Sequence, residues 1–297
     1  MKKSRKTAIV IGVILLIGIY YYVTLPAINI HSTDTWFYIA GLIVFILVFY
    51  VIRKRMRPTE IRESKPAKAM LTVLLAVGVV YLIGSILSSP IVNAKKYQKL
   101  LKVEKGNFTE DVEEVSFDSV PLLDKDTAEI LGDRKMGSMV DMVSQFEADD
   151  IYTQINYKER PVRVTPLKYA SFIKWITNQS EGIPAYIRID MASQNTELVK
   201  LDQGIKYSTS EYLNRNIYRH LRFRYPTAIF DELSFEIDDK GVPYWVAPVK
   251  KFNIGLFGGE TVGSVVLCNA VTGECKSYKI EDVPQWVDRA YSADLLV

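Results

Sequence analysis

The stretch Ile155-Asn-Tyr-Lys-Glu-Arg-Pro-Val-Arg-Val-Thr-Pro166 occurs a second time as Ile237-Asp-Asp-Lys-Gly-Val-Pro-Tyr-Trp-Val-Ala-Pro248. The Ile, the Lys, both Pro residues and the second Val of the first copy each have a counterpart 82 positions later (237 − 155 = 82). Several matches at one fixed offset indicate a duplicated structural unit. The sequence therefore predicts two tandem repeats, which we place at residues 124–205 and 206–282.

Each repeat is expected to begin with a helix. Asp126-Thr-Ala-Glu129 and Ser208-Thr-Ser-Glu211 have the form of capping boxes, in which the first side chain accepts from a backbone N–H and the Glu reaches back. The apolar spacing predicts helices over 127–143, 166–177 and 209–225, strands over 151–157, 162–164, 234–238 and 244–247, and hairpins over 186–201 and 265–280. This order predicts an α+β region of tandem helix-on-antiparallel-sheet repeats.

The two hairpins are related by a smaller offset of 78, which pairs Ala192 with Ala270 and Asn195 with Gly273. Asn and Gly tolerate positive φ, so Asn195 and Gly273 are expected to serve the same turn. Trp175, Trp245 and Trp286 are expected in the core or at an interface.

The first third of the chain predicts a membrane anchor, residues 1–94. Three segments, 8–25, 36–52 and 69–88, carry no charge. Each is near the ~20 residues that a helix needs to cross the hydrocarbon of a bilayer. The alternatives are a cleaved signal peptide for the first segment and a buried core helix for another, but no small-x-small cleavage site precedes the polar loop. The sequence therefore predicts an α-helical anchor of three transmembrane helices.

Basic residues predict the orientation of this anchor. They cluster before the first segment and between the second and third, and none lies in the connection 26–35. The basic residues are Lys2, Lys3, Arg5 and Lys6, then Arg53, Lys54, Arg55, Arg57, Arg62, Lys65 and Lys68. The positive-inside rule then places the N-terminus in the cytoplasm and residues 95–297 outside it, in a multi-pass protein of the cell membrane.

Composition excludes several classes of function. The formal net charge of +3 is too small to indicate a nucleic-acid partner. With Cys268, Cys275 and two histidines in the chain, we predict no metal site and no cofactor. If the turn of the second hairpin is Val271-Thr272, the cysteines lie opposite each other, whereas a bulge at Gly273 points them to opposite faces. The Thr-Gly pair suits the bulged turn better, so the sequence favours cysteines that do not pair.

The second hairpin resembles a known family. Asn269, Ala270, Thr272, Gly273 and Glu274, behind an apolar strand and a capped helix, look like the hairpin of a PepSY-type domain. The resemblance covers residues 206–280 well and 124–201 poorly. It implies an extracytoplasmic regulatory or binding role of the kind associated with protease propeptides, and no catalytic residue.

The remaining candidates are surfaces. Residues 215–224 form the densest basic run of the non-membrane part, and Leu213, Ile217 and Leu221 are expected to share its buried face. The candidate partner-binding residues are Arg215, Arg219, Arg222, Arg224, Leu256 and Phe257. Each set also has a simpler interpretation, a solvated helix face for the arginines and a loop folded onto the core for Leu256 and Phe257. The acidic residues Asp149, Asp150, Asp238 and Asp239 are interpreted as turn residues.

These observations favour a non-enzymatic, membrane-anchored extracytoplasmic protein of the cell envelope that binds or regulates another protein, with a peptidase as one such partner. The anchor leads into a stem at 95–123, and residues 283–297 are expected to form a C-terminal helix or the start of a further segment. The alternative function is an auxiliary subunit of a transporter or envelope-assembly complex. An enzyme with an unrecognised site is a third hypothesis.

Overall fold

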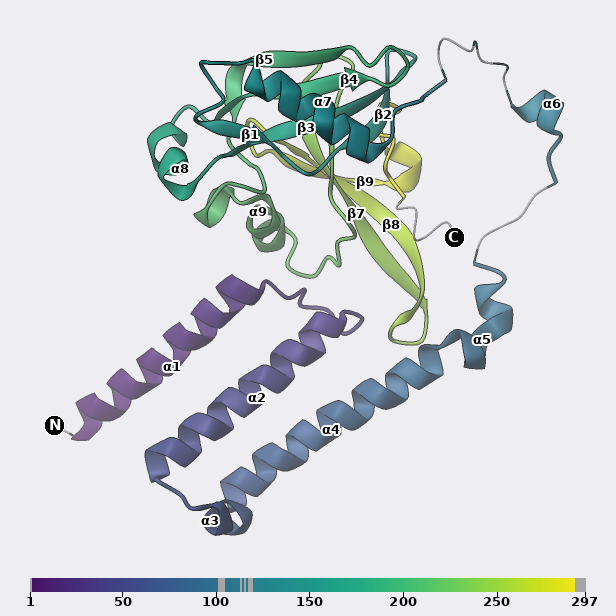
Figure 1. Ribbon diagram of the computed structural model, residues 1–297. Coiled ribbons are helices and arrows are strands. Elements are labelled where there is room, and N and C mark those ends of the chain that lie inside the picture. Colours follow the sequence, from purple (N-terminus) through teal and green to yellow (C-terminus); the bar gives the residue numbers. More distant parts are fainter. Residues whose placement is uncertain (1, 101–104, 113, 115, 117–119, 292–297) are drawn as a thin grey trace. The chain divides into compact units, whose positions relative to one another are not determined.

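The computed structural model describes residues 2–100, 105–112, 114, 116 and 120–291 (Figure 1). It divides the chain into two compact units. Unit 1 comprises Met1–Leu101, Tyr225–Ile229 and Lys251–Thr261, and unit 2 comprises Lys102–Arg224, Phe230–Lys250 and Val262–Val297. Two short segments from the second half of the sequence therefore belong with the N-terminal helices.

Unit 1 is built mainly from helices. They are α1 (Lys2–Thr24), α2 (Thr33–Lys54), α3 (Pro58–Glu63), α4 (Lys65–Ser88) and α5 (Pro90–Tyr97). By length and composition α2 and α4 can cross a membrane, whereas the apolar segment of α1, Ile11–Thr24, is shorter. α2 buries none of its side chains within the described residues, a pattern typical of a helix that faces an apolar solvent.

The structure thus confirms that all three predicted segments are helical. It also confirms that two of them, α2 and α4, are long enough to span a membrane. Local chemistry sets the ends of these helices. Arg55 takes up a left-handed conformation (φ 51°) at the end of α2, and prolines stand in the first turns of α3, α4 and α5.

The first half of unit 2 is a helix-flanked antiparallel sheet. Its elements are α6 (Phe108–Asp111), α7 (Lys125–Gly137), β1 (Phe146–Ala148), β2 (Thr153–Tyr157), β3 (Arg160–Tyr169), α8 (Phe172–Asn178), β4 (Ile183–Asp190) and β5 (Thr196–Ile205). The order is β1-β3-β4-β5, and β2 also pairs with β3. β3 is long enough for both, because β2 pairs with its first half and β1 with its end.

The second half of unit 2 contains a four-stranded meander in the order β6-β7-β8-β9. Its elements are η2 (Leu213–Arg215), α9 (Ile217–Arg224), β6 (Ser234–Ile237), β7 (Pro243–Ile254), β8 (Gly258–Asn269), β9 (Cys275–Lys279) and η3 (Ile280–Asp282). β7 and β8 form a long ribbon, whose outer end belongs to unit 1. The α+β prediction with antiparallel sheets is confirmed.

Aromatic side chains fill the core of unit 2. Trp245, Phe235 and Tyr186 are fully buried, and their rings contact one another in sequence, with centroids 5.4 Å apart for Phe235 and Trp245 and 6.1 Å apart for Tyr186 and Phe235. Tyr186 comes from the first sheet and the other two from the second. Trp175 is also buried and Trp286 half-buried, as predicted.

Several predicted elements are wrong in extent. The helix expected over 127–143 ends at Gly137, and Asp124, not Asp126, caps it by accepting from the Thr127 N–H. Residues 166–169 continue β3, so the helix expected from 166 begins at Phe172. Residues 283–291 contain no helix, and the rest of the expected C-terminal helix lies outside the described residues.

The second capping box is also wrong. Ser208 and Glu211 cap no α-helix; the short 3-10 helix η2 begins at Leu213 and α9 begins at Ile217. The backbone carbonyl of Ser208 accepts from the Ile217 N–H, so this segment closes a loop. Tertiary hydrogen bonds hold the Glu211 carboxylate, which is therefore not available to a helix end.

Candidate functional site

The arginine segment Arg215–Arg224 contacts its own unit. Arg215 donates to the Gln179 carbonyl oxygen at 2.5 Å, and Arg219 donates to that of Leu213 at 2.8 Å. Arg222 lies over the ring of Phe230, and Arg224 is exposed. The first guanidinium thus ties η2 to the end of α8, and the second ties α9 to η2.

Leu213 does not lie on the buried face of this segment. Its backbone is left-handed (φ 52°) and its side chain is 63% exposed, whereas Ile217 and Leu221 are buried as predicted. The left-handed conformation breaks the helical spacing on which the prediction rested. A left-handed conformation is rare for residues other than Gly and costs free energy.

A buried carboxylate lies beside the arginines. Glu211 is 2% exposed, and it accepts hydrogen bonds from Tyr169 Oη at 2.8 Å and from Trp175 Nε1 at 2.7 Å. Burial raises the pKa of Glu211. Sequence reasoning missed this site because it assigned Glu211 to a helix cap.

An aromatic cluster covers that carboxylate. Phe172 stacks on Trp175 with ring centroids 5.4 Å apart, and Tyr212 lies 4.7 Å from Trp175 and 5.1 Å from Phe172. A cavity of about 380 Å³ adjoins the cluster, and Tyr169, Phe172, Glu211, Tyr212 and Arg219 are among its lining residues. Of the predicted candidates, Arg219 therefore lines a pocket.

A larger cavity, about 630 Å³, lies along β2. Its lining comes from the β2–β3 hairpin, from Pro121 and from the C-terminal segment. The lining residues include Gln154, Asn156, Glu159, Arg163, Asp288 and Arg289. The Asn156 N–H donates to Asp288 Oδ2 at 2.6 Å, so this amide points away from β3 and into the region of the cavity.

Glu236 fixes the C-terminal segment. Its side chain is fully buried and accepts from the N–H groups of Asp288 at 2.9 Å and Arg289 at 3.1 Å, and from Ser234 Oγ at 2.9 Å. Burial raises the pKa of Glu236 to about 7, although these hydrogen bonds favour the ionised form. One wall of the larger cavity therefore depends on a buried carboxyl group.

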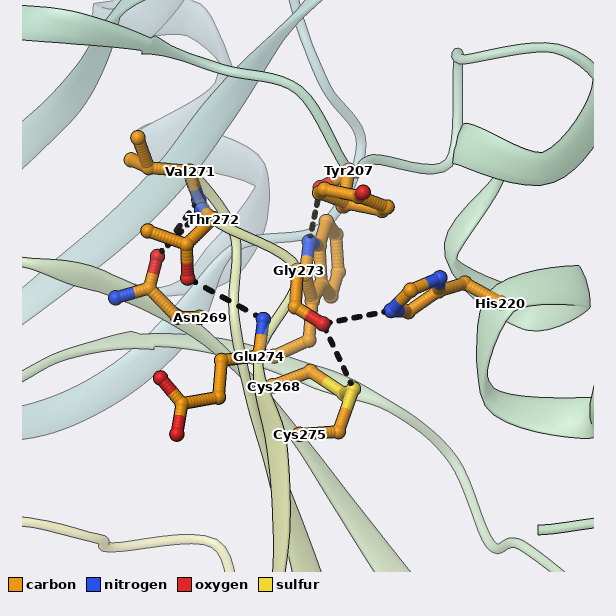
Figure 2. The surroundings of a disulfide bond; sticks show 10 residues. Tyr207, His220, Cys268, Asn269, Val271, Thr272, Gly273, Glu274 and Cys275 are labelled. Carbon is orange, nitrogen blue, oxygen red and sulfur yellow. Dashed lines mark hydrogen bonds between the residues drawn. A yellow bond between two sulfur atoms is a disulfide. The ribbon is translucent and has the colours of Figure 1, made fainter. Parts of the chain in front are cut away.

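Cys268 and Cys275 form a disulfide across β8 and β9 (Figure 2). They are directly opposite in the register, and the turn between them spans Ala270 to Gly273 (φ 74°). His220 Nε2 donates to the Gly273 carbonyl oxygen at 2.7 Å, and Tyr207 packs on the glycine. Of the two registers considered from the sequence, the structure has the one with facing cysteines, and the preference for a bulged turn is wrong.

His220 and the two cysteine sulfurs lie within 4.8 Å of one another, the one group of this kind among the described residues. The disulfide consumes both thiolates, which are the forms that bind metal. In the oxidised protein the group therefore offers the imidazole alone.

Removing this disulfide should destabilise the β8–β9 hairpin. It closes a loop of eight residues (275 − 268 + 1 = 8), for which the loss of chain entropy corresponds to about 2 kcal/mol. We expect a reductant to lower the free energy of opening of residues 264–279 by that amount, measured by hydrogen exchange. The double variant Cys268→Ser/Cys275→Ser should show the same loss and no response to reductant. Unchanged exchange of the wild type after verified reduction would contradict this.

In unit 1, Leu256 and Phe257 pack on α4. Both backbone N–H groups donate to Ser88 Oγ, at 2.9 and 3.1 Å, and the Leu256 carbonyl oxygen accepts from His31 Nδ1 at 2.7 Å. A Cβ at Gly84 would lie 2.8 Å from Leu256 Cδ1, so the glycine allows this approach without a shift of the Leu256 side chain. Phe257 also contacts the rings of Trp36 and Tyr81.

The predicted candidates thus fall into two sets. Leu256 and Phe257 belong to unit 1, and the arginines belong to unit 2. Asp238 accepts from the N–H groups of Lys240 and Val242, as expected of a turn residue. No family model, curated protein or solved structure matches this chain.

Proposed function

We propose that this chain is a membrane-anchored binding protein, and that unit 2 lies outside the cytoplasm and captures an extended segment of another envelope protein. The cavity along β2 is the observation that carries this proposal. It is open, it borders a strand edge, and it offers both charges and amides as lining groups. Extended peptides bind such edges through backbone hydrogen bonds, with adjacent side chains supplying specificity.

The membrane topology is part of the proposal. α2 and α4 have the length and composition of spans, and we assign α1 as a third. The basic residues of the α2–α4 connection include Arg53, Arg55 and Arg57. With these on the cytoplasmic side, three spans put the chain after α4 on the other side.

Duplication of an α+β unit is supported by equivalent hydrogen bonds in the two sheets. The Met191 N–H donates to the Pro161 carbonyl oxygen, and the Ala270 N–H donates to that of Pro243. Asp190 Oδ1 and Asn269 Oδ1 each accept from the residues two and three positions later.

These bonds relate the two turns by an offset of 79 residues (269 − 190 = 79), one more than the offset of 78 inferred from the sequence. Gln194 (φ 61°), not Asn195, therefore corresponds to Gly273, and the prediction for Asn195 is wrong. In a duplicated scaffold, α8 occupies the connection that in the second half is the tip of the β7–β8 ribbon. A PepSY-like role, with a peptidase as the partner, remains part of the proposal.

Photo-crosslinking in the native membrane tests this function. A photoreactive amino acid at Gln154, which is exposed and lines the cavity, should capture the partner. The matched control is Gln203, an exposed glutamine on β5 that does not line the cavity. A third probe at Arg224 tests the predicted arginine surface. Equal capture from Gln154 and Gln203, or none from Gln154, would exclude the cavity as the binding site.

The same experiment addresses the auxiliary-subunit alternative. That alternative is favoured by the contact of Leu256 and Phe257 with α4. A membrane partner that displaces α4 would also displace the tip of the β7–β8 ribbon, which carries these two residues. Capture of a multi-helix membrane complex from probes in unit 1, at Leu82 or Ile86 of α4, would support it. Capture of a peptidase from Gln154 would support the regulatory function instead.

A further inference from the structure

A group of apolar side chains protrudes from unit 2 around α8 and η2. We call it the α8 platform, and it consists of Phe172, Ile173, Ile176, Tyr212 and Leu213. Ile173 is 70% exposed, and the other four are between 44% and 63% exposed. Large apolar groups this exposed, and adjacent, are unusual on a protein surface without an interaction to make.

Hydrogen bonds and ring contacts fix the platform to unit 2 although it is exposed. Arg215 ties η2 to the end of α8 through Gln179, and Glu211 holds Trp175, which packs under Phe172 and Tyr212. Leu213 keeps its left-handed backbone, with its carbonyl oxygen bonded to Arg219. The left-handed backbone of Leu213 and these hydrogen bonds thus keep the apolar side chains exposed to solvent. This indicates a surface that is pre-organised for contact.

Basic residues outnumber acidic ones in the two segments that carry the platform. Residues 171–181 and 212–224 contain five basic residues and one acidic residue exposed to solvent, Glu181. The basic residues are Lys174, Arg215, Arg219, Arg222 and Arg224. Apolar tips flanked by cations are typical of helices that lie in the interface of an anionic bilayer.

We infer that the α8 platform inserts into the headgroup region of an anionic bilayer and forms a second membrane contact of the chain. The inference uses the membrane anchoring proposed above, because a tethered surface meets the bilayer at high effective concentration. It is independent of the partner cavity along β2, since none of the platform residues lines that cavity.

The shape and chemistry of the platform favour lipid over protein as the occupant. Ile173 and Ile176 stand on the outer face of a short helix and can enter acyl chains without a matching pocket. Tyr212 has an amphipathic ring of the kind enriched at the level of the headgroups, and Phe172 adds apolar surface of the kind that interfacial helices bury. Lys174 can extend its ammonium to phosphate while its alkyl part lies along the apolar surface.

The test uses the full-length protein in nanodiscs with a polarity-sensitive fluorophore on the variant Ile173→Cys. The native cysteines are held as a disulfide and do not react with a maleimide dye. In discs of phosphatidylglycerol and phosphatidylcholine, we expect the dye at position 173 to be quenched by lipids spin-labelled near the headgroup. The additional change Lys174→Gln should reduce the ratio of inserted to free platform about fivefold, the factor for one cation near an anionic surface.

The control carries the same dye on Val140→Cys, an exposed apolar position outside the platform. Equal quenching at 140 and 173, or none at 173, would overturn the inference. So would shielding of position 173 that rises with protein concentration and ignores the lipid quencher, because it would identify a protein contact. Incorporation into the discs reports the anchor separately, and capture from Gln154 reports the proposed function.

Discussion

Replacing Glu211 with Ala lowers the free energy of opening of the α8 region by about 3 kcal/mol, roughly a hundredfold in the opening constant. The substitution leaves two buried donors, Tyr169 Oη and Trp175 Nε1, without their acceptor. Each unsatisfied buried donor costs about 1–3 kcal/mol. Hydrogen exchange of β3 and α8 in the full-length protein measures the loss locally, which avoids assuming that both units unfold together.

The conservative variant Glu211→Gln separates hydrogen bonding from charge. Its amide oxygen can accept from Trp175, and its NH₂ group can donate to Tyr169 Oη, because a phenol oxygen both donates and accepts. We therefore expect Glu211→Gln to retain most of the protection that Glu211→Ala loses. If both variants lose the same protection, the negative charge of Glu211, and not its hydrogen bonds, holds the aromatic cluster.

This site shows why sequence reasoning failed at Glu211. Its partners Tyr169 and Trp175 lie 42 and 36 residues away, and no local pattern encodes contacts over that distance. The tetrad Ser208-Thr-Ser-Glu211 has the composition of a capping box, but a buried hydrogen-bond pair outweighs the ~1 kcal/mol of a helix cap. Tertiary structure therefore overrides the local preference.

The membrane segments were predictable because their signal is local. An uncharged apolar segment of about 20 residues indicates a membrane helix whatever the rest of the fold is. α2 and α4 confirm this, and their ends follow nearby prolines and basic residues. The positive φ of Arg55 is a detail that composition does not reveal.

The hairpin around Cys268 and Cys275 is an intermediate case. Its strands and its Asn-x-x-x-Gly turn follow from the sequence, but the register depends on how many residues the turn contains. The Asn269 side chain decides it by accepting from the N–H groups of Val271 and Thr272. This closes a four-residue loop and brings the cysteines face to face.

The contact between Leu256 and Ser88 shows the limit of local reasoning. The two residues are 168 positions apart, and neither carries a charge or a motif. What the sequence does contain is the pair of glycines, Gly255 and Gly259, that flank the tip with positive φ. They indicate a tight turn but give no information about the helix on which it packs.

A second large effect is expected from pH, through Glu236. Burial raises its pKa from 4.5 to about 7. A group whose pKa is raised on folding contributes stability that is complete below its unfolded pKa and is lost as pH rises through the folded one. Between pH 4.5 and 7 the free energy of opening of the β6 region and its C-terminal contact should therefore fall by about 3 kcal/mol.

Other groups also have pKa values shifted by folding, so the wild-type curve alone does not identify Glu236. Burial also raises the pKa of Glu211 and of Asp288, which gives the same sign, whereas it lowers the pKa of His220, which gives the opposite sign. The variant Glu236→Gln removes one titration and leaves the other three residues in place. The difference between the two hydrogen-exchange curves then isolates the contribution of Glu236.

The substitution Glu236→Gln also removes a hydrogen-bond acceptor, and this effect on stability does not depend on pH. Oε1 and Oε2 of Glu236 both accept backbone N–H groups, from Arg289 and Asp288, and an amide replaces one acceptor with a donor. Glu236→Gln should therefore be less protected at pH 5 by about 1 kcal/mol, yet its protection should fall by about 3 kcal/mol less than that of the wild type as the pH rises to 8. Parallel curves for the two proteins would show that Glu236 stays ionised throughout, and that its hydrogen bonds to the C-terminal segment outweigh its burial.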